Sequence, residues 1–150
     1  MPLHSALTGT DLHEPKGVAA AAAGKIYLSN GLGGGSWVVP PYTINAVIDD
    51  VSTASTIYIP VPYAGTVTKV VTVLAGSLTT ANAIVTVRNA AGTSMGTLTI
   101  TQAGSAAGDV DTLLPASNNT FVSDSKIQID TDGASDTTRK LFVTVYIQGS

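Results

Sequence analysis

The 150-residue chain contains no cysteine, only two histidines and few charged residues, which make up 11% of it. The absence of cysteine excludes disulfide bonds, thiolate catalysis and thiolate metal sites. The chain must therefore fold without covalent cross-links, which fits cytosolic folding or stabilisation by association with other subunits. Because charges are scarce, Thr, Ser, Asn and Gly must cover most of the surface, and such a surface suits burial against partners.

Basic residues are also few and scattered. The formal net charge is −3, and of the seven basic residues only Arg139 and Lys140 are adjacent. Nucleic-acid-binding proteins need clustered Lys and Arg to displace counterions, so we expect no nucleic-acid partner. The longest apolar run, residues 18–23, is far shorter than the roughly 20 residues of a membrane span. The N-terminus also lacks the basic and apolar regions of a signal peptide, so we expect neither a membrane partner nor general export.

Residues 42–150 show an alternation of Thr, Val and Ile with a period of two, interrupted by Gly, Ser, Asn and Asp. This pattern predicts strands separated by turns. The expected strands cover residues 43–49, 56–60, 66–74, 83–89, 96–101, 110–114, 126–130 and 139–148. About eight short strands without a helical stretch predict an all-β fold, an antiparallel β-sandwich of jelly-roll type. Pro60 and Pro62 place the second of these strands at a sheet edge or at its own end.

The last predicted strand carries apolar side chains on both faces. One face consists of Leu141, Val143, Val145 and Ile147. The opposite face presents Phe142 and Tyr146. These two aromatic side chains either pack against another subunit or are covered by the same chain. We therefore take Phe142 and Tyr146 as candidate residues of a subunit interface.

Residues 1–41 differ in composition and are rich in Gly and Ala. Residues 1–24 are predicted to form an irregular, extended arm, and residues 25–41 a small β-element or linker with Trp37 as an aromatic anchor. The stretch Gly31-Leu32-Gly33-Gly34-Gly35 fails both the dinucleotide-binding and the P-loop patterns. We therefore interpret it as a flexible linker.

No constellation of residues favours catalysis. Both histidines, His4 and His13, lie in the predicted arm, and no further His or Cys is available to complete a zinc site. A Ser–His–Asp arrangement remains open, but the Gly-x-Ser-x-Gly elbow is absent. The acidic turn at residues 130–136, with Asp109 and Asp111, leaves a calcium site as an alternative. We expect no enzyme activity, no cofactor and no metal.

The arm carries a resemblance to a known class of proteins. Residues 7–18 read LTGTDLHEPKGV, and KIYLSNG and GSW follow at residues 25–31 and 35–37. This series resembles the N-terminus of tailed-bacteriophage head decoration (cement) proteins and of virion fibre proteins. The segments AGTVTKV at 64–70 and GSAAGDV at 104–110 are similar to the β-domain that follows that arm.

The resemblance implies a homotrimer on the capsid surface, with the arm docked on the major capsid protein. The residues it implicates in docking are Leu7, Asp11, Leu12, His13, Glu14, Pro15, Lys16, Gly17 and Trp37. The chain adds no long repetitive shaft, which favours decoration over a fibre. The expected function is a structural protein of the virion, assembled in the host cytoplasm, that stabilises the head by bridging capsid subunits. The alternative is a head or tail fibre or adhesin module that binds host glycans.

Overall fold

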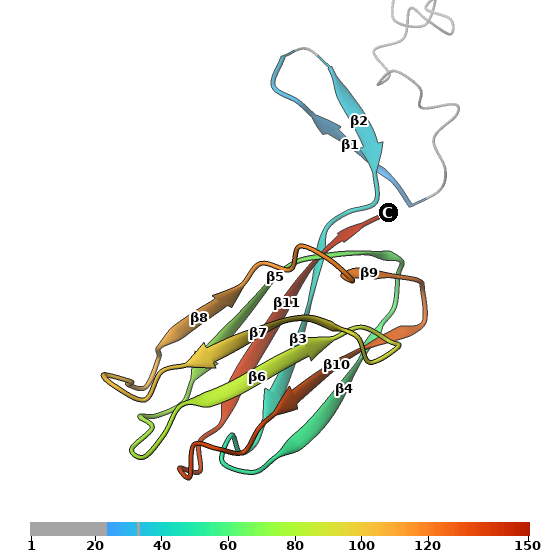
Figure 1. Ribbon diagram of the computed structural model, residues 1–150. Coiled ribbons are helices and arrows are strands. Elements are labelled where there is room, and N and C mark those ends of the chain that lie inside the picture. Colours follow the sequence, from blue (N-terminus) through green and yellow to red (C-terminus); the bar gives the residue numbers. More distant parts are fainter. Residues whose placement is uncertain (1–23, 33) are drawn as a thin grey trace, which may run out of the picture. The chain divides into compact units, whose positions relative to one another are not determined.

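The computed structural model describes residues 24–32 and 34–150, which form eleven strands and no helix (Figure 1). The chain divides into two compact units, one ending at Pro40 and the other covering Pro41–Ser150. In the part that is described, no helix is long and apolar enough to cross a membrane. The predicted arm lies almost entirely in residues 1–23, outside the described residues.

The first unit contains an antiparallel hairpin of β1 (Ile26–Ser29) and β2 (Gly35–Val38). Asn30 organises its loop, since its side-chain oxygen accepts hydrogen bonds from the backbone N–H groups of Leu32 and Gly34, at 2.9 and 3.1 Å. A Cβ atom at Gly35 would collide with the carbonyl oxygen of Leu28, so this position needs glycine. Of the two alternatives given for residues 25–41, the structure shows the small β-element, and Gly31, Gly34 and Gly35 belong to its hairpin instead of a flexible linker.

The second unit is a sandwich of two antiparallel sheets. One sheet has the strand order β4-β10-β6-β7, and the other has the order β3-β11-β5-β8, with β9 also pairing with β5. The bounds are β3 Tyr42–Ile48, β4 Ser55–Val61, β5 Gly65–Leu74, β6 Ala83–Arg88, β7 Ser94–Ile100, β8 Val110–Leu113, β9 Thr120–Phe121, β10 Ser125–Thr131 and β11 Leu141–Gly149.

The pairing pattern is that of a jelly roll. β3 pairs with β11, β4 with β10, β5 with β8, and β6 with β7, so the chain forms one long antiparallel ribbon. The ribbon is rolled up, because β11 also pairs with β5 and β10 also pairs with β6. Two Greek-key layers result, each with four of these eight strands, and β9 adds a fifth strand to one of them; this is the jelly-roll arrangement.

The core lies between the two sheets and follows the sequence alternation. In β6, Ala83, Val85 and Val87 are fully buried. In β10, Ile127 and Ile129 point inward, and in β11 the buried positions are Leu141, Val143, Val145 and Ile147. The intervening residues point outward, because successive side chains of a strand lie on opposite faces.

The predicted all-β sandwich is confirmed, with a corrected number of strands. Eleven strands are present among the described residues instead of about eight. The eight predicted segments correspond to β3–β8, β10 and β11; β9 and the hairpin account for the other three strands. β4 is an edge strand that contains Pro60, as the prolines predicted.

Candidate functional site

An apolar row crosses the outer face of the β3-β11-β5-β8 sheet. Phe142 lies opposite Val47 of β3 and opposite Val73 of β5, and Val73 lies opposite Val110 of β8. Phe142 is 48% exposed, Val47 42% and Val110 60%, while Val73 is half-buried. We call Val47, Phe142, Val73 and Val110 the apolar row. A continuous apolar strip of this kind on an outer sheet face is typical of a contact surface.

Further along the same face the side chains become polar. The Thr144 hydroxyl donates to the side-chain oxygen of Asn45 across the strands, at 2.8 Å. One pair further, the Lys69 ammonium lies 4.3 Å from the centre of the Tyr146 ring. Tyr146 is 37% exposed and is held in place by this cation–π contact. The face therefore combines an apolar row with an ordered polar and aromatic border.

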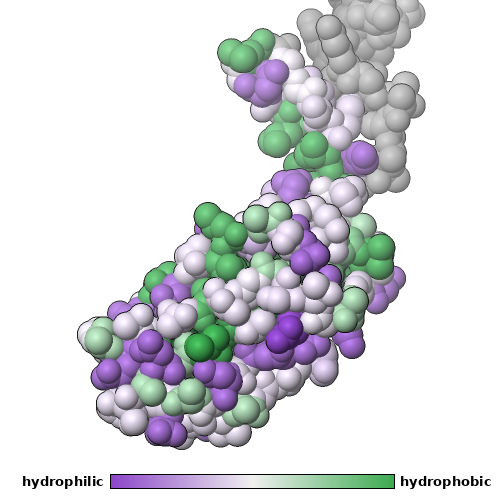
Figure 2. All heavy atoms as spheres, viewed as in Figure 1, coloured by the Kyte–Doolittle hydropathy of each residue, from purple (hydrophilic) through white to green (hydrophobic). Residues whose placement is uncertain are grey.

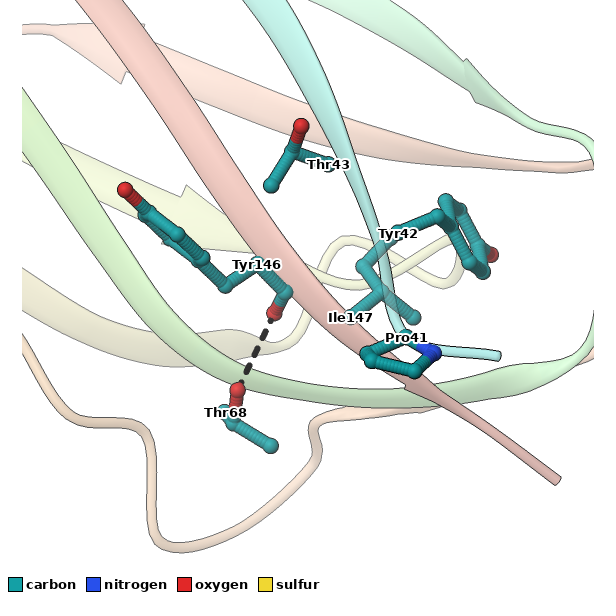
Figure 3. A pocket seen from close by; sticks show the side chains of 6 residues that line it. All are labelled: Pro41, Tyr42, Thr43, Thr68, Tyr146 and Ile147. Carbon is teal, nitrogen blue, oxygen red and sulfur yellow. Dashed lines mark hydrogen bonds between the residues drawn. The ribbon is translucent and has the colours of Figure 1, made fainter. Parts of the chain in front are cut away.

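A groove lies beside Tyr146, where β5 contains a bulge at Thr68 (Figure 3). Its volume is about 280 Å³, and its walls are mostly apolar. It is lined by Pro41, Tyr42, Thr43, Thr68, Tyr146 and Ile147. The Tyr42 hydroxyl donates to the carbonyl oxygen of Tyr63 at 2.6 Å, and partial burial raises the pKa of Tyr42. That hydroxyl is occupied in holding the fold, so it is a poor candidate for catalysis.

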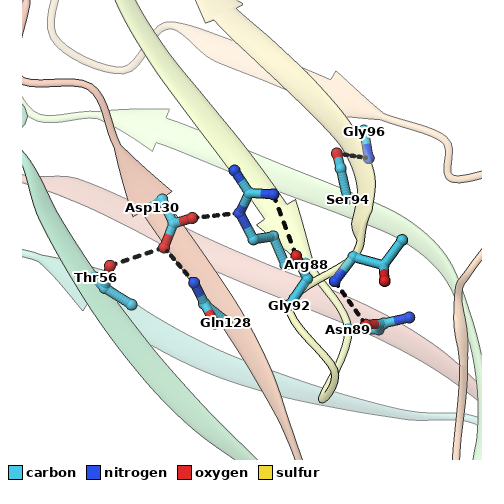
Figure 4. A network of polar contacts seen from close by, with 9 residues as sticks. Thr56, Arg88, Asn89, Gly92, Ser94, Gly96, Gln128 and Asp130 are labelled. Atoms are coloured by element: carbon cyan, nitrogen blue, oxygen red, sulfur yellow. Dashed lines mark hydrogen bonds and ion pairs between the residues drawn. The ribbon is translucent and has the colours of Figure 1, made fainter.

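The outer face of the β4-β10-β6-β7 sheet carries a network around Asp130 (Figure 4). The Asp130 carboxylate accepts hydrogen bonds from Thr56 at 2.8 Å and from Gln128 at 2.9 Å, and it forms an ion pair with Arg88 at 2.5 Å. Partial burial raises the pKa of Asp130, but the hydrogen bonds and the Arg88 charge outweigh it, so the pKa is lowered overall. Arg88 also donates to the carbonyl oxygen of Gly92 at 3.2 Å.

An exposed tyrosine borders this network. Tyr58 lies directly opposite Gln128, which in turn lies opposite Arg88. Its side chain is 60% exposed, and the Lys126 ammonium lies 4.6 Å from the ring centre. The aromatic ring and the polar network thus share one solvent-facing surface. We call Tyr58, Gln128, Arg88 and Asp130 the polar patch.

Several of the carboxylates that the sequence left open as a calcium site accept hydrogen bonds from the protein itself. Asp130 belongs to the network above, and one Asp132 oxygen accepts from the backbone N–H groups of Ile84 and Ala134, at 3.0 and 3.2 Å. The Asp109 carboxylate accepts from the backbone N–H of Ala106 at 2.6 Å. Residues 24–32 and 34–150 contain no group of three or more His, Asp or Glu that could hold a metal ion.

The residues that the sequence singled out belong to different units of the chain. Phe142 and Tyr146 lie on one outer sheet face, as the alternation predicted. Trp37 lies in the hairpin, packed edge to face on Tyr27 with ring centres 5.4 Å apart. The other predicted docking residues lie outside the described residues; they are Leu7, Asp11, Leu12, His13, Glu14, Pro15, Lys16 and Gly17.

Sequence reasoning missed the polar patch, and it missed the side chains that lie beside Phe142 in the apolar row. Val73 and Val110 were assigned to strands, but their alignment with Phe142 depends on pairing between distant segments. Arg88 and Asp130 likewise meet only because β6 and β10 are neighbours. One signal was available, because an Arg and an Asp at outward positions of strands with few other charges are good candidates for an ion pair.

Comparison with known proteins leaves the chain without an assigned family. No family model matches it, and no curated protein matches it. Among solved structures, a protein of the disulfide-linked pili that form Bacillus endospore appendages is 14% identical, with a TM-score of 0.35. That similarity covers 74% of this chain and 88% of the pilus protein. At this level it carries no argument about function, so the surfaces themselves must supply one.

Proposed function

We propose that this chain is a structural, non-enzymatic subunit of a tailed-bacteriophage virion that binds the outer surface of the head. In this proposal it assembles as a homotrimer, contacts the major capsid protein and stabilises the shell by bridging capsid subunits. The apolar row is the observation that carries the proposal. Its four side chains, on four adjacent strands, form a partly exposed apolar surface of the kind that subunit contacts bury.

Two further features support the same function. Charged residues make up 11% of the chain, and a surface of low charge tolerates extensive burial between subunits. Jelly rolls are also a common architecture of viral capsid domains, although fold alone does not assign function. The resemblance of residues 7–18 to phage head proteins points in the same direction.

Co-sedimentation with empty capsids tests the proposal. Deletion of residues 2–24 is expected to leave the sandwich folded but to abolish capsid binding. Phe142→Ser is expected to weaken the binding at least tenfold, because it removes the central side chain of the apolar row. Tyr58→Ser is the matched control, since it removes an exposed aromatic ring from the opposite sheet. Unchanged binding by both the deletion and the Phe142 variant would refute the docking role.

The polar patch favours a second candidate, a fibre or adhesin module for host glycans. Sugar-binding surfaces combine an exposed aromatic face with fixed polar groups, and Tyr58 beside the Arg88–Asp130 pair provides both. Adsorption of the full chain to host cells and to a glycan array tests this function. Saturable binding that Tyr58→Ser abolishes and Phe142→Ser preserves would favour the glycan function over decoration.

A further inference from the structure

The β1–β2 hairpin exposes apolar side chains on a very small sheet. Ile26 lies opposite Val38, and Leu28 lies opposite Ser36, so these four residues share one face. Ile26 is 43% exposed and Leu28 58%, while Val38 is half-buried. We call Ile26, Leu28 and Val38 the hairpin face. Figure 2 shows hydrophobic side chains on the side of the hairpin that is in view.

A hairpin of this size has little stability on its own. Each strand has four residues, and an isolated two-stranded hairpin is at best marginally stable in water. Independent stability needs further strands or a packed apolar face. The other face of the hairpin already has one stabilising contact, the edge-to-face packing of Tyr27 and Trp37. We therefore expect the hairpin face to pack against another apolar surface.

The composition of the hairpin indicates what covers it. Residues 26–38 contain no Asp, Glu, Lys or Arg. A partner with a charged docking surface would find no complementary group there, whereas the same uncharged apolar face of other copies can pack against it and leave no charge unpaired. The strands also lack the charged residues that proteins place on exposed strands to prevent association.

We propose that the hairpin is a self-association element, whose face packs against the same hairpin face of other copies of this chain. The inference rests on the proposed homotrimer and names the segment that joins the copies. It does not depend on capsid binding, so the two can fail separately. Packing of the copies supplies the apolar burial that the hairpin lacks and orders it.

Oligomeric state and Trp37 fluorescence provide the test, because Trp37 is the only tryptophan of the chain. The wild-type protein is expected to be trimeric by native mass spectrometry and light scattering. Leu28→Lys is expected to weaken association at least tenfold and to shift the Trp37 emission to longer wavelength. Leu32→Lys is the control, since Leu32 lies in the hairpin loop and is 91% exposed. It is expected to leave both measurements unchanged.

Cross-linking gives a second readout that preserves the apolar face. The chain has no cysteine, so Ser36→Cys introduces a single thiol, which can form a disulfide only between copies. Mild oxidation is expected to link Ser36→Cys molecules, while Ser123→Cys, exposed before β10, is expected to stay unlinked.

Three outcomes would overturn the inference. A trimer that Leu28→Lys leaves intact and Ser36→Cys does not cross-link would place the subunit contact elsewhere and preserve the homotrimer. A wild-type monomer would reject the homotrimer and the hairpin contact together. A monomer whose Trp37 emission shifts only when capsids are added would assign the hairpin to the capsid instead.

Discussion

Replacement of Thr72 by valine is expected to stabilise the sandwich. Thr72 lies in β5, points into the core and is 1% exposed. Among the described residues its hydroxyl oxygen is buried without a hydrogen-bond partner. A buried hydroxyl without a partner costs about 1–3 kcal/mol, and valine has nearly the same shape without the polar atom. We therefore expect Thr72→Val to raise the free energy of unfolding by about 1–2 kcal/mol.

Urea unfolding followed by far-UV circular dichroism, at one fixed protein concentration, measures this change. The melting temperature is expected to rise by about 4–8 °C, on the scale typical of a domain of this size. Thr99→Val is the matched control, because Thr99 is exposed on the edge strand β7. Its effect is expected to stay within about 0.5 kcal/mol, as for most surface substitutions.

Destabilisation of 1 kcal/mol or more by Thr72→Val would refute the reasoning. It would mean that the hydroxyl is hydrogen-bonded in solution. Asp111 would then be the first partner to test, since it lies directly opposite Thr72 on the edge strand β8. Repeating the valine substitution in an Asp111→Asn background would measure that coupling directly.

Three further predictions concern charges and the hairpin. Asp130 has a lowered pKa, so its ionised carboxylate stabilises the fold at pH values above its ordinary pKa of 3.8. This stability is lost as the pH falls through the folded pKa. Asp130→Asn is therefore expected to flatten the loss of stability below about pH 4 in acid titrations followed by circular dichroism. Burial, and to a lesser extent the charge of Asp109, raises the pKa of Asp111. Its stabilising effect is therefore present below its unfolded pKa and is lost as the pH rises through the folded pKa. Because the ionised carboxylate is unfavourable in the folded state, Asp111→Asn is expected to raise the melting temperature at pH 7, and this gain is expected to shrink toward pH 3. Gly35→Ala is expected to disrupt the hairpin and red-shift the Trp37 emission while the sandwich melts as in the wild type, because the new methyl group meets the carbonyl oxygen of Leu28.

The strands of the sandwich could be predicted because alternation is a local signal. Ile127 and Ile129, for example, are both buried, and Gln128 between them is not. β9 escaped detection because its two residues, Thr120 and Phe121, are too few to show a period. In β5 the bulge at Thr68 changes the phase, so the inward positions cannot be read from the sequence without the pairing.

The candidate surfaces were less predictable than the strands. The outward direction of Phe142 follows from its own strand, but its neighbours Val47 and Val110 come from β3 and β8. The Arg88–Asp130 pair likewise depends on which strands are adjacent. Two-residue periodicity assigns a face to each side chain, whereas the pairing of strands decides which side chains meet.

The rolled ribbon also decides where foreign peptides can be grafted. β3 and β11 are antiparallel neighbours, so Tyr42, near the entry of the chain, is paired with Ile147, close to the last residue, Ser150. A peptide fused after Ser150 would therefore leave the sandwich at the end where β3 begins. The loop between β7 and β8 lies at the opposite end of the sandwich. There the backbone N–H of Leu74, the last residue of β5, donates to the carbonyl oxygen of Asp109, whereas the first residue of β5, Gly65, pairs with Gly149. Its Gly104 has open space around it, which makes this loop the better position for display.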